Sequence, residues 1–205
     1  FSSVVIYVIN SMDAITSQDI KLLSSVIEEG RGIILAANKW DLVEDKWKQR
    51  ATKWMESQIE KCLGQIRDIN IFYVSAKTGF RVNGMMNEVI RAYDKWNARV
   101  STGLLNDWLR KFKKVQTPPS INGRRLRMRF ICQVKTRPPT FFLYVNNKKL
   151  IRPNYHRFLI HSISEEFGFN GVPIRIILKD NKRLDKTPEE QINERLARRN
   201  QSKGG

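Results

Sequence analysis

The stretch Gly32-Ile33-Ile34-Leu35-Ala36-Ala37-Asn38-Lys39-Trp40-Asp41 decides the fold, because it joins an unbroken apolar run to a short polar segment. A continuous aliphatic run is typical of a strand that is buried on both faces of a sheet. Residues 4–9 and 69–74 have the same character. Helical periodicity follows these runs at residues 17–29 and 44–63 and near residues 89–96. Strands that alternate with helices predict a parallel sheet in an α/β domain.

The predicted helices have recognisable ends and inward faces. Thr16 or Ser17 suits the N-cap of the first helix, and Gly30 suits the position just after it. From the spacing of apolar residues, the predicted inward positions of the second helix are Trp47, Trp54 and Cys62. Those of the third helix are Val89, Ile90, Tyr93 and Trp96.

Polar motifs close the second and third predicted strands. Asn38-Lys39-Trp40-Asp41 follows one strand, and Ser75-Ala76-Lys77 follows the other. In parallel α/β sheets, ligands bind beyond the carboxyl ends of the strands. We therefore expect the two motifs to meet in one site.

The side chains of these motifs suit guanine. Guanine presents two adjacent donors, N1–H and the exocyclic amine, and the carboxylate of Asp41 can accept from both. Adenine lacks this pair of donors, and sites built on hydrogen bonds reject such analogues by about four to five orders of magnitude. Asn38 either contacts the base edge or ties the two loops together. The Ala76 N–H suits the guanine O6, while Lys39 and Lys77 can cover opposite sides of the base.

The phosphate half of a nucleotide site has no counterpart in residues 1–205. A Gly-x-x-x-x-Gly-Lys-Ser/Thr loop cradles phosphates and places a hydroxyl on magnesium, and no such run occurs in the sequence. Phosphoryl transfer depends on that loop and its metal. We therefore expect this chain alone to be inactive toward GTP. The chain opens at Phe1, directly before a buried type of strand, and we expect it to be a piece of a longer protein.

The positive charge of the chain is concentrated in its second half. Of the net charge of +17, residues 1–100 contribute +2 and residues 101–205 contribute +15. Such an excess indicates a polyanionic partner, most often nucleic acid, although a merely soluble cationic surface is the alternative. Two isolated thiols, Cys62 and Cys132, favour a reducing compartment, and His156 and His161 are too poorly spaced to share a metal. No run is long and apolar enough to span a membrane.

The second half predicts a small α+β domain. We expect helices at residues 101–114 and 154–167 and strands at 125–132, 140–145 and 174–179. The predicted apolar face of the first of these helices is Leu104, Leu105, Trp108, Leu109 and Phe112. Arg125, Arg127 and Arg129 alternate with apolar residues, so they form either an RNA-binding row or a solvated strand face. Gly168-Phe169-Asn170-Gly171 matches a phosphate-clamping Gly-x-x-Gly, but its position between a helix and a strand favours a simple turn. The tail at residues 183–205 is basic, and either a short helix or disorder fits it.

Several ordered motifs resemble the Der/EngA family of tandem-GTPase ribosome-assembly proteins. The matching segments are Asp13-Ala14-Ile15-Thr16-Ser17-Gln18-Asp19, Asn38 to Val43, Ser75 to Gly79, Ala92-Tyr93, Asn122 to Leu126, Thr136 to Phe141 and Gly171 to Arg175. The family's usual glycine before Ile-Thr is Ala14 here. The resemblance implies the latter half of a parallel-sheet, P-loop-type G domain at residues 1–100, followed by a KH-like RNA-binding domain at 101–182.

The resemblance also implies a function and a set of binding residues. The function is GTP-switched assembly of the large ribosomal subunit, with GTP or GDP as ligand and ribosomal RNA as partner. The phosphate loop, the switches and the magnesium ligands would lie in upstream G domain segments outside this chain. The implied guanine-binding residues are Asn38, Lys39, Asp41, Ser75, Ala76 and Lys77. The candidate RNA-binding residues are Arg124, Arg125, Arg127, Arg129 and Arg137.

Two alternatives remain open on the sequence. One is a constitutive RNA-binding module whose half G domain is a scaffold. The other is the related single-G-domain KH GTPase of the small subunit, whose Gly-x-x-Gly should lie between two helices. The expected location is the bacterial cytoplasm, or an organellar matrix or stroma if the source is a eukaryote, with no membrane partner.

Overall fold

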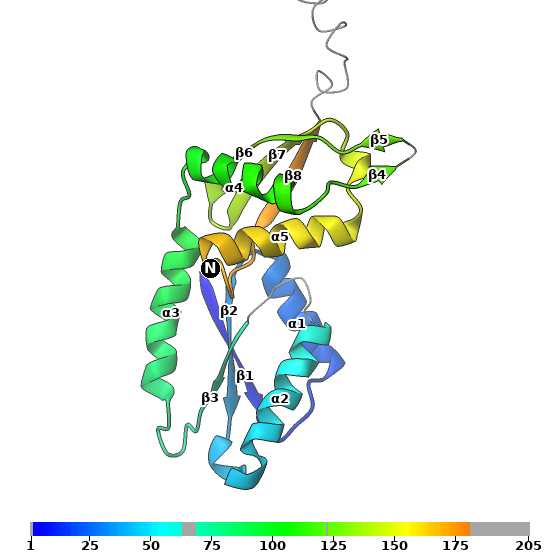
Figure 1. The fold of residues 1–205 in the computed structure, drawn as a ribbon. Helices are drawn as coiled ribbons and strands as arrows, with labels where there is room; N and C mark the ends of the chain where they lie inside the picture. Colours follow the sequence, from blue (N-terminus) through cyan, green and yellow to red (C-terminus); the bar gives the residue numbers. More distant parts are fainter. Residues whose placement is uncertain (1, 63–68, 122, 181–205) are drawn as a thin grey trace, which may run out of the picture. The chain divides into compact units, whose positions relative to one another are not determined.

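A computed structural model describes residues 2–62, 69–121 and 123–180 of the chain (Figure 1). The described residues form two compact units. Residues 2–99 belong to the first unit together with 135–140 and 157–175, and the second contains 100–134, 141–156 and 176–180. The predicted tail at 183–205 lies outside the described residues.

A three-stranded parallel sheet organises the first unit. Its strands are β1 (Val4–Asn10), β2 (Gly32–Asn38) and β3 (Asn70–Tyr73), in the order β1-β2-β3. Val4 pairs with Gly32 and Ile34 pairs with Asn70, and both pairings are parallel. The predicted α/β class with a parallel sheet is therefore confirmed. All three strands end at the same edge of the sheet, where the polar motifs follow β2 and β3.

Three helices cover this sheet, and their ends follow from local chemistry. They are α1 (Ser17–Glu28), α2 (Asp45–Cys62) and α3 (Val82–Asn97). Thr16 is the N-cap of α1 and forms a capping box with Asp19, as one of the two predicted caps. Gly30 has φ +76°, the left-handed conformation that glycine adopts after a helix. Figure 1 shows α3 on one side of the sheet and α1 and α2 on the other.

The strand β2 is buried on both faces, which explains its unbroken apolar run. Leu35 and Ala37 pack with residues of α1 and α2 on one face. Ile34 and Ala36 pack with Met85 of α3 and its neighbours on the other. Each fully buried aliphatic side chain contributes about 1.5–3 kcal/mol to folding. The polar motif after β2 is consequently attached to the most deeply buried strand of the unit.

Two predicted helix faces differ from the structure. Trp47 and Trp54 are exposed, and Met55 and Ile59 are the residues of α2 that enter the core. The indole of Trp47 is instead flanked by the charged ends of Lys46 and Arg50. The prediction was wrong because it assigned the inward face of α2 from its large aromatic residues, whereas the smaller apolar residues Met55 and Ile59 are the buried ones. The side chain of Cys62 lies outside the described residues.

The inward face of α3 was also only partly predicted. Trp96 is buried, and its indole nitrogen donates to the Gly30 carbonyl at 2.7 Å. Ile90 and Tyr93 are 63% and 39% exposed, because Met85 and Ala92 face the sheet in their place. The predicted inward positions Ile90 and Tyr93 were therefore wrong.

The second half of the chain forms a smaller α+β arrangement. Its helices are α4 (Thr102–Val115) and α5 (Pro153–Phe167). A second sheet has the strand order β6-β7-β8, with β6 at Met128–Thr136, β7 at Pro139–Val145 and β8 at Arg175–Asp180. A short antiparallel pair, β4 (Ser120–Ile121) and β5 (Arg124–Arg125), was not predicted. Short 3-10 turns at Trp40–Leu42 and Lys148–Leu150 were also not predicted.

Two details of this region correct the predictions. The single strand expected at 125–132 is divided into β5 and a later, longer β6. Leu104 is exposed, while the buried face of α4 consists of Leu105, Trp108, Leu109 and Phe112. Gly168 and Gly171 have φ +71° and +76° in the connection between α5 and β8, and the Phe169 N–H donates to the Ser164 carbonyl at 2.8 Å. The segment is thus a turn after a helix, as its position favoured.

Candidate base-recognition site

Main-chain hydrogen bonds hold the two polar motifs beside each other. The Trp40 N–H donates to the Val74 carbonyl at 3.0 Å, and the Val74 N–H donates to the Ala37 carbonyl at 2.9 Å. The parallel pairing of β2 with β3 is thereby continued past the last paired residues. Asn38 and Ala76 are 38 residues apart in sequence, and the structure brings the two motifs beside each other.

The Asn38 side chain ties the loops together. Its amide oxygen accepts from the Ala76 N–H at 2.9 Å. The Asn38 carbonyl also accepts from the Ser11 N–H at 2.9 Å, so the loop after β1 is held to the end of β2. Of the two roles open for Asn38, the structure has the loop-tying one. A guanine O6 would have to share the Ala76 donor with Asn38 or take its place.

A left-handed residue turns the chain within the first motif. Lys39 has φ +63°, which is uncommon for a residue with a Cβ and costs about 1 kcal/mol or more. After this turn the Trp40 side chain is buried, with its ring centroid 4.3 Å from that of Tyr73. Lys39 and Asp41, on either side, remain exposed. Trp40 is thus an anchor for the turn, and the exposed side chains of Lys39 and Asp41 can reach a ligand.

The carboxyl group of Asp41 is held in its ionised form. The Ser75 hydroxyl beside it is the main cause of a lowered pKa, and the positive charge of Lys77 contributes less. Ser75 is fully buried, and its hydroxyl oxygen accepts from the Thr78 N–H at 3.2 Å. An ionised carboxylate only accepts hydrogen bonds, and this is the form that two guanine donors require. The electrostatics of the site therefore suit the predicted role of Asp41.

Two supporting residues were not identified from the sequence. Trp40 anchors the turn, and Thr78 supplies the N–H that orients the Ser75 hydroxyl. The available signal for Trp40 was a large apolar residue within an otherwise polar loop. Thr78 had no signal of its own, since its contribution is a main-chain donor. A bridge from Ser75 to Phe80 further closes the second loop, with the Ser75 N–H donating to the Phe80 carbonyl at 3.2 Å.

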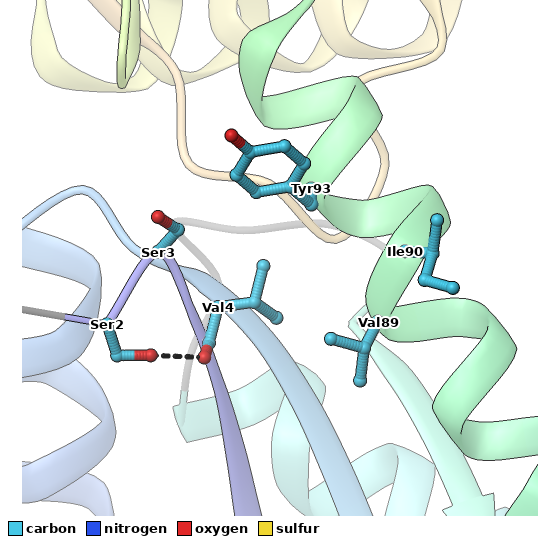
Figure 2. A pocket seen from close by; sticks show the side chains of 6 residues that line it. All are labelled: Ser2, Ser3, Val4, Val89, Ile90 and Tyr93. Carbon is cyan, nitrogen blue, oxygen red and sulfur yellow. Dashed lines mark hydrogen bonds between the residues drawn. The ribbon is translucent and has the colours of Figure 1, made fainter.

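A pocket opens beside β1 in the first unit. It has a volume of about 350 Å³ and is lined by Ser2, Ser3, Val4, Val89, Ile90 and Tyr93. Figure 2 shows the α3 side chains facing the start of β1 across this space. The wall is mostly apolar, and β1 is an edge strand of the described sheet. Ile90 and Tyr93, which were predicted to face inward on α3, line this pocket, and this explains why they are exposed.

The candidate RNA-binding arginines lie in different surroundings. Arg125, Arg127 and Arg129 are exposed and alternate with the buried residues Leu126 and Met128. Arg137 is exposed and belongs to the other compact unit, where its Nε donates to Asn97 Oδ1 at 2.7 Å. The side chain of Arg124 lies outside the described residues.

A buried asparagine fixes the main chain under the arginine row. Asn146 Oδ1 accepts from the Arg127 N–H at 2.9 Å, and the Asn146 N–H donates to the Arg127 carbonyl at 3.1 Å. Its Nδ2 also donates to the Arg125 carbonyl at 3.1 Å. This side chain takes the place of a neighbouring strand between β5 and β6. The exposed arginines consequently project from a backbone that Asn146 holds by three hydrogen bonds.

Histidine, cysteine and acidic residues form no metal site in the described ranges. No group of three or more potential ligands comes together among these residues. His156 is partly buried, with its Nε2 2.9 Å from the Ile176 carbonyl. Cys132 is a free thiol. None of the described helices has the length and hydropathy to cross a bilayer.

Comparisons with known proteins match the two halves to separate family models and most of the chain to single relatives. Residues 2–95 match the model of the elongation factor Tu GTP binding domain. Residues 99–179 match the model described as KH-domain-like of EngA bacterial GTPase enzymes, C-terminal. The chain is 36% identical over 183 residues to the GTPase Der of Rickettsia typhi, covering 89% of this chain and 41% of that protein. It is 37% identical over 179 residues to the GTPase Der of Mesorhizobium japonicum, covering 87% and 37%.

The matched models define the class of the chain: part of an α/β domain of the GTP-binding type, followed by a KH-like domain. The loop pair at the carboxyl edge of the parallel sheet and the two matched models agree on that class. Both relatives are named GTPase Der, and the similarity extends over nearly the whole chain. The chain belongs to the Der/EngA family. It spans about two fifths of the length of these relatives.

Proposed function

We propose that this chain supplies the base-recognition half of the nucleotide site, and the RNA-binding domain, of a GTP-switched ribosome-assembly factor. The complete protein would hydrolyse GTP to GDP and phosphate and act on the large ribosomal subunit. The KH-like domain would bind ribosomal RNA. The observation that carries the proposal is the ionised Asp41 carboxylate beside the Ser75 hydroxyl, in loops already joined by Asn38.

The residues divide the work of reading the base. Asp41 would accept from N1–H and the exocyclic amine of guanine, and the Ser75 hydroxyl would donate to the same carboxylate. Lys39 and Lys77 would cover the two sides of the ring. GTP or GDP fits this set because the recognition groups match guanine and not adenine. Magnesium would be held by phosphate-side residues that are not in this sequence.

Among the described residues β1 is an edge strand, and this position supports completion of the sheet by a further segment. Its run Val4–Ile9 carries no charge or proline, the usual protection of an exposed edge strand, and Val8 is 60% exposed. Beside it lies the apolar pocket lined by Ile90 and Tyr93. We propose that upstream G domain residues pair with β1 and cover this pocket. The phosphate loop would then lie at the carboxyl ends of the strands, where Asp41 lies. Nucleotide hydrolysis then requires that segment.

The test is a change of base preference in the longer protein that carries both halves. Asp41→Asn should weaken GDP binding about 100-fold, because the guanine donors lose their charged acceptor. The affinity for xanthosine diphosphate should rise. Xanthine has a carbonyl where guanine has the exocyclic amine, and the Asn amide can donate to that carbonyl. Isothermal titration with GDP, ADP and xanthosine diphosphate measures all three affinities.

Asp45→Asn is the matched control. Asp45 is exposed four residues along, and its pKa is lowered chiefly by Lys48, outside the loop pair. This variant should bind GDP like the unchanged protein. Unchanged guanine preference in Asp41→Asn would overturn the assignment.

A constitutive RNA-binding module is the second candidate, favoured by the concentration of +15 in residues 101–205. It predicts RNA affinity that falls steeply with salt but does not differ between GDP and a non-hydrolysable GTP analogue. The switched factor predicts at least a fivefold difference, the lower end of usual coupling free energies. Filter binding of ribosomal RNA fragments in both nucleotide states distinguishes the two.

A further inference from the structure

The outer face of the second sheet carries side chains that base recognition does not explain. In the middle strand β7, Phe141, Leu143 and Val145 are fully buried. Phe142 and Tyr144, which alternate with them, are only partly buried. Successive side chains of a strand point to opposite faces. One face of this sheet therefore packs into the core, and the other reaches solvent even at its central strand.

Both neighbouring strands extend this solvent-reaching surface. Phe130 of β6 is 40% exposed, and its ring centroid lies 5.9 Å from that of Tyr144. Ile177 of β8 is 41% exposed, and Lys179, two residues along, has its Nζ 4.5 Å from the Phe142 ring centroid. We call these five residues the aromatic face. An exposed group of apolar side chains of this kind marks a binding surface more often than single exposed residues do.

The second unit, to which the aromatic face belongs, has an excess of positive charge. Its residues 100–134, 141–156 and 176–180 contain 12 Lys+Arg and two Asp+Glu. Asp180 follows Lys179, but its carboxylate accepts from the Lys148 N–H at 2.7 Å and lies 3.7 Å from the Lys148 ammonium. The partner that complements this surface is an anion with flat apolar groups. Single-stranded nucleic acid combines these properties, because phosphates alternate with bases whose faces can stack.

A local irregularity joins the arginine row to the aromatic face. Met128 and Ile131 are both buried, so the two residues between them, Arg129 and Phe130, are exposed in succession. A bulged residue breaks strand alternation in this way and redirects a side chain. The last arginine of the row is therefore adjacent in sequence to the first ring of the face. A single strand of nucleic acid whose phosphates lie along the arginines would have aromatic rings beside it on which its bases can stack.

We propose that the aromatic face is a platform on which unpaired bases of single-stranded RNA stack, with Phe130, Tyr144 and Phe142 as the stacking residues. This deepens the proposed RNA-binding role and rests on it. A duplex would not serve, since its base faces are covered by neighbouring pairs. Stacking on an aromatic side chain contributes about 1–3 kcal/mol per base and tolerates any base. The platform thus selects unpaired RNA and not a sequence.

The experiment compares single-stranded and duplex RNA on the chain of residues 1–205. Fluorescence anisotropy with a labelled uridine 12-mer and a 12-base-pair duplex measures both affinities. Phe130→Leu and Tyr144→Leu retain apolar bulk but remove the ring. Each should weaken single-strand binding about 5- to 20-fold, within the range expected for a lost stack. Duplex affinity and the salt dependence of single-strand binding should not change, because no charge is altered.

The matched control is Trp54→Leu, which removes an exposed aromatic ring of the first unit, outside both the base-recognition loops and the aromatic face. It should leave both affinities unchanged. A second measurement does not depend on variants: light-induced cross-linking of a 5-iodouridine 12-mer should label peptides that contain Phe130, Phe142 or Tyr144.

Specific outcomes separate failure of the platform from failure of the proposed function. If Arg127→Gln weakens RNA binding while the leucine variants do not, and cross-links map elsewhere, the platform is wrong and RNA binding stands. If the unchanged chain binds neither RNA, both are wrong. If the leucine variants instead change the molecular mass in light scattering, the face joins two copies of the chain, and the platform is overturned.

Discussion

The two sheets of this protein leave different parts accessible to a ligand. The first sheet is covered by helices on both sides, so β2 is buried throughout and only the strand ends can meet a ligand. The second sheet buries one face and leaves Phe130, Phe142 and Tyr144 on the other. A parallel sheet that helices cover on both faces binds ligands at the carboxyl ends of its strands. A sheet that is covered on one face only can bind ligands across the other face. The same comparison decides which substitutions each sheet tolerates.

The largest expected effect tests the difference in burial. Leu35→Ala, in the fully buried β2, should lower the free energy of unfolding by about 2–5 kcal/mol, through lost burial and a cavity. Ile177→Ala, on the outer face of the second sheet, should cost less than about 1 kcal/mol because its side chain is already partly in water. Chemical denaturation followed by amide hydrogen exchange in β2 and β8 measures both. Equal losses would mean that the outer face is packed in solution.

A smaller effect tests whether the strand ends act as one site. Asn38→Ala removes the acceptor of the Ala76 N–H and should weaken GDP binding about tenfold in the longer protein, as expected for one hydrogen bond that also orders two loops. Asn70→Ala is the control at the opposite end of β3, where Asn70 donates to Glu88 at 2.8 Å. It should affect stability but not base affinity, and titration calorimetry with GDP distinguishes the two variants.

The smallest effect is a shift in a titration. The Ser75 hydroxyl lowers the pKa of Asp41 below its ordinary value of 3.8, so the carboxylate persists as the pH falls through that value. Ser75→Ala should raise this pKa, and binding of guanine should then be lost at a higher pH than in the unchanged protein. The stability that this group contributes is present above the unfolded-state pKa and is lost as the pH falls through the folded-state pKa.

Carbon-13 NMR of the carboxyl groups measures this shift, with Asp45 as an internal reference. The pKa of Asp45 is lowered by Lys48 and should not respond to Ser75→Ala. A shift of both groups would indicate a general structural change and contradict the specific role of Ser75.

The sequence predicted the covered sheet better than its surroundings. A run such as Ile33 to Ala37 requires apolar contacts on both faces, so its burial could be recognised without knowing the partners. Helix faces need a partner to be defined, and Trp47 and Ile90 were assigned inward positions that the structure gives to Met55 and Ala92. The arginine row was recognised from simple alternation. The break between β5 and β6 was not, because it depends on Asn146, about twenty residues away.

The candidate site shows the same division. Polar side chains at the end of a buried strand have a chemical signature, and Asn38 and Asp41 carry it. Main-chain groups such as the Thr78 N–H have none, since any residue except proline supplies one. Geometry alone chose between the two roles of Asn38. The aromatic face was not found from the sequence, because Phe142 and Phe141 look alike until the fold places them on opposite sides of β7.

The bond between Asn38 and Ala76 has a consequence for the rate of nucleotide capture. Loops that must first find each other lose conformational freedom when a ligand arrives, and that loss slows productive encounters and weakens the complex. Here the two loops are already joined without a ligand. A guanine nucleotide would therefore meet loops that are already in place, and O6 would only have to share or displace the Asn38 acceptor at the Ala76 N–H. Differences in affinity between bases should accordingly appear in how long each nucleotide stays bound.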